Sequence, residues 1–298
     1  MLAHITPISS QLVLAPYYYN SEDNKLGTRD RRLNIAILIL SLAIVLVSQA
    51  GCSFVRYTIA AIRSTDHFVP NKQDHRVLFE PGAEDFANKI VSFLPSAIQQ
   101  VEDKQYQLFS KTVRVYICST RDSFKKHYGA DVRAGVLTKL FLSPRLLEQD
   151  DEILYLYLVH ELSHLHLLQK LGVYKNSRLP MWFKEGLATY ASDGGGAHLV
   201  SESQAIESIK SGNHFIPNKT GGFIFRKTPS DFNLKPHMFY RQSMMFITFM
   251  VSKNELEFQK FLLYVGKGER LSVALRKAYN NGLQELWSEF LEEVKKKG

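Results

Sequence analysis

The pattern of hydrophobic and polar positions divides the chain into a polar start, one apolar run and a longer mixed region. Residues 1–32 are polar and irregular, and we expect little regular structure there. From Leu33 to Val55 no charged residue occurs, and this stretch is long enough to span a bilayer, which takes about 20 residues. Its most apolar part is shorter and also matches the apolar region of a signal peptide.

After this run, the chain is expected to continue through a polar linker, residues 56–80, into a folded domain over residues 81–298. Within the domain, hydrophobic positions follow helical and strand periods in turn. Helices are expected over 83–102, 122–128, 150–172 and 181–192. Strands are expected over 112–118 and 136–142.

The second half of the domain is expected to contain helices and one long loop. The segment 194–237 is rich in Gly, Ser, Asn and Pro, with one short helix expected at 202–210. Such a long, weakly patterned segment is often a lid or a binding loop. Three or four helical segments follow, at 238–252, 256–265, 271–279 and 283–295. We expect an α+β fold, in which a region of helices and strands is followed by a helical region.

Charged residues next to the apolar run indicate how it is oriented in a membrane. Four basic residues precede it, and positive charge marks the cytoplasmic side of a span, here residues 1–32: Lys25, Arg29, Arg31 and Arg32. The stretch from Gln49 to Cys52 resembles the end of a bacterial lipoprotein signal, except at Gln49, where an aliphatic residue is usual. We therefore expect a protein of the bacterial cell membrane, with a single-pass anchor or a lipid on Cys52. The domain would lie outside the cytoplasm, and a buried core helix is the alternative for residues 33–55.

Composition narrows the possible partners. The chain has a net charge of +8, which is compatible with contact with an anionic membrane surface but does not require it. No nucleic-acid-binding motif occurs, so we expect no nucleic-acid partner. Cys52 and Cys118 are the only cysteines, which excludes a disulfide framework.

The strongest chemical signal is the stretch His160-Glu161-Leu162-Ser163-His164, which has the HExxH pattern. Residues four apart share one face of a helix, so both imidazoles can bind one metal ion, while Glu161 is placed to act on a water. Catalytic zinc usually has three protein ligands and one open position. We take Glu185, in the next expected helix, as the third ligand.

Together with Pro180-Met181-Trp182-Phe183-Lys184-Glu185-Gly186-Leu187-Ala188, this motif resembles the gluzincin metallopeptidases, the thermolysin-like clan. The closest likeness is to bacterial peptidase-MA-like proteins with a W-x-x-E-G-x-A motif. The resemblance implies a zincin-like domain with a small N-terminal helix and strand lobe, a central HExxH helix and a helical C-terminal lobe. It also implies Zn²⁺ bound by His160, His164 and Glu185, with Glu161 as the general base.

Two residues are less well defined by the resemblance. It places a tyrosine near Tyr240, which we take as the donor to the oxyanion; a packed core tyrosine is an equal alternative, and His214 and His237 are others. Thermolysin-like enzymes have an acid four residues after the ligand glutamate, where this chain has Thr189. The orientation of one zinc-binding histidine is therefore left without an explanation.

These observations predict a membrane-attached zinc metallopeptidase acting on peptides or proteins. A peptide substrate could add itself to the expected strand at 136–142 by backbone pairing. One rival hypothesis is a zinc-binding envelope assembly or scaffold protein of the same fold with little or no proteolysis. The other is an accidental HExxH in a protein that binds no metal.

Overall fold

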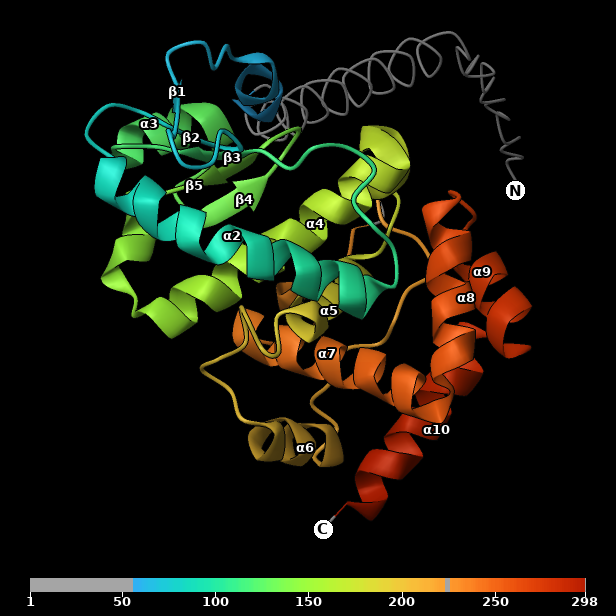
Figure 1. The fold of residues 1–298 in the computed structure, drawn as a ribbon. Coiled ribbons are helices and arrows are strands. Elements are labelled where there is room, and N and C mark those ends of the chain that lie inside the picture. Colours follow the sequence, from blue (N-terminus) through green and yellow to red (C-terminus); the bar gives the residue numbers. More distant parts are fainter. Residues whose placement is uncertain (1–55, 223–225, 298) are drawn as a thin grey trace, which may run out of the picture. The chain divides into compact units, whose positions relative to one another are not determined.

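The structure of the chain, a computed structural model, describes residues 56–222 and 226–297. It shows an α+β arrangement, as the sequence predicts, with a small mixed sheet and its covering helices in one part and a group of helices in the other (Figure 1). The long helix α4, Asp151–Ser177, passes between the two parts.

The sheet is built from very short strands in the order β1-β2-β3-β5-β4. Its three central strands are parallel, and the outer two are antiparallel to their neighbours. The strands are β1 (Val69–Pro70), β2 (Val77–Phe79), β3 (Val115–Ile117), β4 (Ala134–Val136) and β5 (Leu140–Leu142). The edge on one side is therefore β4, which runs next to α4.

Two expectations from the sequence are wrong at this sheet. The strand expected over 136–142 is a hairpin: Val136 pairs with Leu140, and the chain turns between them. The segment contains none of the Gly, Pro, Asn or Asp residues that usually mark a turn, so the sequence does not reveal it. The expected linker 56–80 contributes β1 and β2, because Val77 and Phe79 are buried in the core.

Helices cover both faces of the sheet. On one face, α2 (Glu84–Gln105) and α4 enclose a core that contains Ile90, Leu158 and Leu162. On the other face, α3 (Arg121–Tyr128) covers a smaller cluster around Phe124 and Phe141. Figure 1 shows α3 and α4 on opposite sides of the strands.

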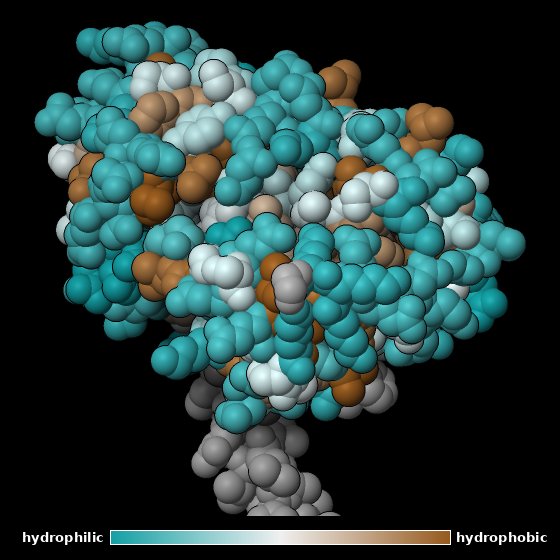
Figure 2. Space-filling model, turned by 90° about the horizontal axis from the view of Figure 1, so that it is seen from below, coloured by the Kyte–Doolittle hydropathy of each residue, from teal (hydrophilic) through white to brown (hydrophobic). Residues whose placement is uncertain are grey.

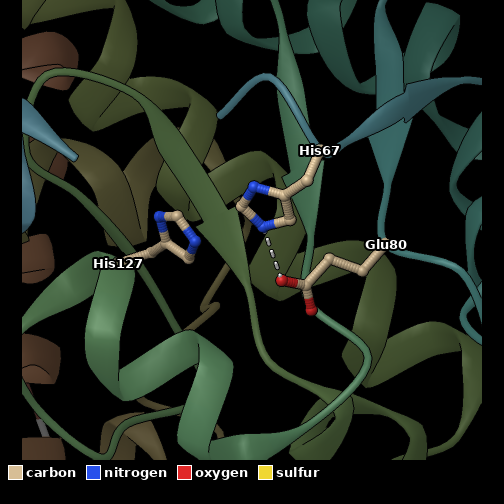
Figure 3. Close-up of side chains that lie close together, drawn as sticks. All are labelled: His67, Glu80 and His127. Carbon is tan, nitrogen blue, oxygen red and sulfur yellow. Dashed lines mark hydrogen bonds and ion pairs between the residues drawn. The ribbon is translucent and has the colours of Figure 1, made fainter. Parts of the chain in front are cut away.

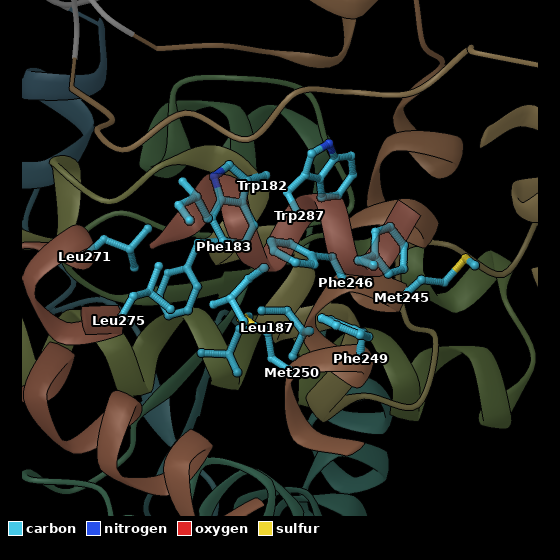
Figure 4. Close-up of a cluster of buried hydrophobic side chains, with 14 of the residues drawn as sticks. Trp182, Phe183, Leu187, Met245, Phe246, Phe249, Met250, Leu271, Leu275 and Trp287 are labelled. Carbon is cyan, nitrogen blue, oxygen red and sulfur yellow. The ribbon is translucent and has the colours of Figure 1, made fainter. Parts of the chain in front are cut away.

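The second part of the domain is a group of helices around an aromatic core. Figure 4 shows Trp182, Phe183, Phe246 and Trp287 in this core, where the ring of Phe246 contacts those of Trp182 and Trp287. The helices are α5 (Met181–Ala191), α6 (Glu202–Lys210), α7 (Pro236–Lys253), α8 (Glu255–Gly266), α9 (Leu271–Tyr279) and α10 (Leu283–Lys296). Their bounds agree closely with the helices expected from the sequence, and two 3₁₀ turns lie at Pro144–Glu148 and Pro229–Phe232.

Close packing of α5 on α7 depends on Gly186. A Cβ atom at this position would lie 2.7 Å from the backbone oxygen of Ser243 in α7, and backbone cannot move aside as a flexible side chain can. We expect Gly186→Ala to lower the free energy of unfolding by about 1–3 kcal/mol, the usual cost of overpacking, even though alanine favours helix. Urea unfolding followed by circular dichroism measures this change.

Gly266→Ala is the matched control. Gly266 also lies in a helix, but the nearest atom to an added Cβ is the end of the flexible Gln107 side chain, at 2.9 Å. We expect this variant to unfold at nearly the same urea concentration as the parent. Equal stability of Gly186→Ala and Gly266→Ala would contradict the packing argument.

The expected location at a bacterial cell membrane is corrected by the structure. In the part of the chain that the structure describes, no helix is both long enough and apolar enough to cross a membrane. The long helix α4, for example, has 27 residues but includes charged side chains at several positions. Residues 33–55 and Cys52, on which the expectation depended, lie outside the described residues.

The surface view shows one face of the molecule, seen from below relative to Figure 1 (Figure 2). Hydrophilic side chains cover most of this face, and its apolar residues form small, separate groups. Scattered apolar residues of this kind are usual on a protein surface.

Candidate metal centre

Helix α4 presents two histidines on the face that is turned away from the sheet core. The helix begins at the N-cap Asp150, whose side chain accepts a hydrogen bond from the backbone N–H of Ile153 at 2.8 Å. Leu158 and Leu162 pack into the core with α2 and the sheet. Because the α-helix has 3.6 residues per turn, His160 and His164 then share another face.

Helix α5 brings Glu185 to these histidines. Trp182 and Leu187 are buried in the aromatic core, and the indole N–H of Trp182 donates to the backbone oxygen of Asn218 at 2.9 Å. These contacts hold one face of α5 against α7 and leave Glu185 on the face toward α4. The W-x-x-E-G-x-A pattern thus has a physical meaning here: the tryptophan anchors the helix, and the glycine lets α5 approach α7.

The three side chains converge on one point. His160 Nε2 and His164 Nε2 are 3.2 Å apart, and each lies 3.4 Å from Glu185 Oε2. Ligands placed about 2.05 Å from a tetrahedral zinc lie about 3.3 Å from one another. The observed spacing is therefore that of three corners of a zinc tetrahedron, and the donor set, two imidazoles and one carboxylate, is one that zinc prefers.

Two of the three side chains are partly accessible to solvent. The side chain of His160 is only 5% exposed, whereas those of His164 and Glu185 are 19% and 15% exposed. Burial by itself would raise the pKa of Glu185, but the two histidines hold it well below its usual range. The carboxylate of Glu185 is therefore ionised at neutral pH and can bind a cation.

The orientation of His160 has an explanation that the sequence did not reveal. Its Nδ1–H donates to the backbone carbonyl of Gly195 at 2.9 Å, which leaves the lone pair of Nε2 free for a metal. Gly196 has φ +80°, and an added Cβ would lie 3.1 Å from the His160 ring. The carbonyl of Gly195 therefore orients His160 in place of the acidic side chain that the resemblance expects at position 189, where this chain has threonine. Thr189 itself is buried, and its hydroxyl has no hydrogen-bond partner among the described residues.

Glu161 lies beside the three ligands without belonging to them. Burial raises the pKa of its carboxyl group, and the nearby histidines lower it only in part. A carboxylate with a raised pKa is a better proton acceptor than a free glutamate, which suits a general base.

Of the three suggested donors to the oxyanion, Tyr240 lies next to the site. Its ring stacks on His160 with centroids 6.1 Å apart, and the Glu185 carboxylate, with burial, raises the pKa of its hydroxyl, which stays protonated. His214 instead packs near Trp287 in the helical core, at 5.7 Å. His237 packs on His198, with ring centroids 5.0 Å apart.

Sequence reasoning missed two contributors to this site. One is the Gly195 carbonyl, for which the three consecutive glycines were a usable signal. The other is Tyr128, at the end of α3, where burial and then the charge of Glu161 raise the pKa of the hydroxyl. An added Cβ at Gly135 in β4 would meet the Tyr128 ring, so this tyrosine lies across the edge strand.

No family model matches the chain, and no curated protein matches it.

Proposed function

We propose that this chain is a zinc-dependent metallopeptidase with a zincin-like domain. The observation that carries the proposal is the spacing of His160, His164 and Glu185, each ligand atom 3.2–3.4 Å from the other two. These residues would hold Zn²⁺, which when bound supplies a Lewis acid and lowers the pKa of a water towards about 7. Support also comes from Glu161, which a purely metal-storing site does not need.

The protein residues around the metal account for the proton transfers of peptide hydrolysis. Glu161 accepts a proton from the attacking water as its oxygen bonds to the scissile carbonyl carbon. The carbon–nitrogen bond then breaks, and Glu161 gives the proton to the leaving amine. The Tyr240 hydroxyl, protonated at neutral pH, can donate a hydrogen bond to the oxygen that becomes negative.

The sheet offers a place for an extended peptide. Strand β4 is the edge strand, and its outer side is unpaired among the described residues. The sequence suggested that a substrate pairs with a strand at 136–142; in the structure β4 is the strand to which substrate backbone could pair. A peptide there would lie beside α4, with Tyr128 next to Gly135 in the same strand.

Removal and return of zinc tests the activity. We expect the full chain, incubated with a peptide library, to produce cleaved peptides that mass spectrometry detects. Chelation of zinc should stop cleavage, and addition of Zn²⁺ should restore it, because bound zinc would supply the Lewis acid that activates the water. Zinc binding at this site without any cleavage would contradict the peptidase proposal and leave a zinc-binding scaffold.

A second prediction concerns Tyr240. We expect Tyr240→Phe to lower kcat by about 10²- to 10³-fold, as removal of one oxyanion donor does, with zinc content and KM nearly unchanged. Tyr174→Phe is the matched control, because that ring is 72% exposed on the surface. The measurement is the steady-state kcat and KM of both variants on one peptide. An unchanged kcat for Tyr240→Phe would show that Tyr240 serves only in packing.

A further inference from the structure

A second group of possible metal ligands lies on the α3 side of the sheet. His67 precedes β1, Glu80 follows β2 and His127 lies in α3, so three separate segments contribute one side chain each. One ligand atom from each lies within 4.8 Å of the other two. Figure 3 shows His67 pointing at Glu80, with the His127 ring beside them and one of its nitrogens facing His67.

Glu80 is held in place as a ligand carboxylate usually is. It is 7% exposed, and its Oε2 accepts hydrogen bonds from the backbone N–H and the hydroxyl of Ser119, at 2.8 and 3.0 Å. Its Oε1 accepts from Ser123 at 2.5 Å and from His67 Nε2 at 3.0 Å. Such outer hydrogen bonds orient the oxygen atoms of a metal-binding carboxylate.

His127, unlike Glu80, has a buried polar atom without a hydrogen-bond partner. It is only 3% exposed, yet its Nδ1 has no hydrogen-bond partner among the described residues. Buried polar groups in proteins nearly always have a partner, so this ring has hydrogen-bonding capacity that no described residue uses. The ring is stacked on Phe141, with centroids 5.2 Å apart, which holds its plane.

We propose that His67, Glu80 and His127 form a second metal site, selective for a divalent ion of the zinc class. Two imidazoles and one carboxylate suit zinc and its neighbours better than calcium or magnesium, which prefer oxygen ligands. A surface hollow of about 530 Å³ opens onto the cluster and gives access to the remaining coordination position. Its wall includes Arg63 and Lys126, balanced by Asp122 and Glu80.

This second ion would have a role distinct from the first. It would connect the segment before β1, the end of β2 and helix α3, and so tie the outer face of the sheet together. No residue of this cluster belongs to the HExxH site, so each site can be removed by itself.

Zinc counting on the full-length chain tests the site. We expect the metal-stripped parent, titrated with Zn²⁺ against a chromophoric chelator, to bind two ions. His67→Ala and His160→Ala should each bind one, and the double variant none. His67 has a half-exposed side chain, so its removal leaves the core intact. His75→Ala, an exposed histidine outside both clusters, is the matched control and should still bind two.

Thermal unfolding provides an independent measurement. Zn²⁺ should raise the Tm of His160→Ala, in which only the second site remains, and should leave the Tm of the double variant unchanged. A parent and a His67→Ala variant with equal zinc content would overturn the second site while leaving the proposed peptidase centre intact. Loss of zinc in His67→Ala but not in His160→Ala would support the second site and contradict zinc binding at the proposed peptidase centre.

Discussion

Glu161→Gln should abolish peptide cleavage while the protein keeps its zinc. Glutamine has the same shape as glutamate but cannot accept a proton at neutral pH. Removal of a general base usually lowers the rate by about 10²- to 10⁴-fold. Glu161 is not one of the three converging ligands, so its loss leaves His160, His164 and Glu185 unchanged. Peptide turnover and zinc content, measured on the same preparation, give both numbers.

Glu152→Gln is the control for this variant. Glu152 lies in the first turn of the same helix, α4, and its side chain is exposed. It should retain both turnover and zinc. Full turnover by Glu161→Gln would show that another residue is the base. Loss of zinc would show instead that Glu161 is a ligand, so the two failures are distinguishable.

The second large effect is expected at the third ligand. Glu185→Gln should weaken zinc binding at this site by more than about 100-fold, since even loss of an outer-shell partner costs 10- to 100-fold. Its charge is also the only negative one among the three ligands. The measurement is a zinc titration in the His67→Ala background, where only the site on α4 and α5 contributes.

Glu202→Gln serves as the comparison here. Glu202 lies at the exposed start of α6, so its charge is removed far from the convergence point of the ligands. It should bind zinc like the parent. If His160→Ala loses its zinc in this background while Glu185→Gln retains it, Glu185 is not the third ligand, and the tetrahedral reading of the three distances fails.

The elements that the sequence predicted well are those whose signal is local. Leu154, Leu158 and Leu162 recur at helical spacing in α4, and Gly194 follows α5 as a stop signal. Gly172, with φ 69°, only interrupts α4, which continues to Ser177. The four C-terminal helices follow the same rule. The strands were harder, because three residues provide too little pattern to locate a turn or an edge. The hairpin of β4 and β5 was missed for that reason.

The sequence by itself determined that His160 and His164 share one helix face, because the period of a helix depends only on neighbouring residues. It also identified Glu185 as the partner to consider, through the tryptophan and glycine around it. Only the tertiary structure decided that Glu185 Oε2 reaches 3.4 Å from both rings, and that a Gly195 carbonyl orients His160. It alone brought His67, Glu80 and His127 together. These contacts join residues far apart along the chain, and packing of helices on a sheet, which no local pattern encodes, places them.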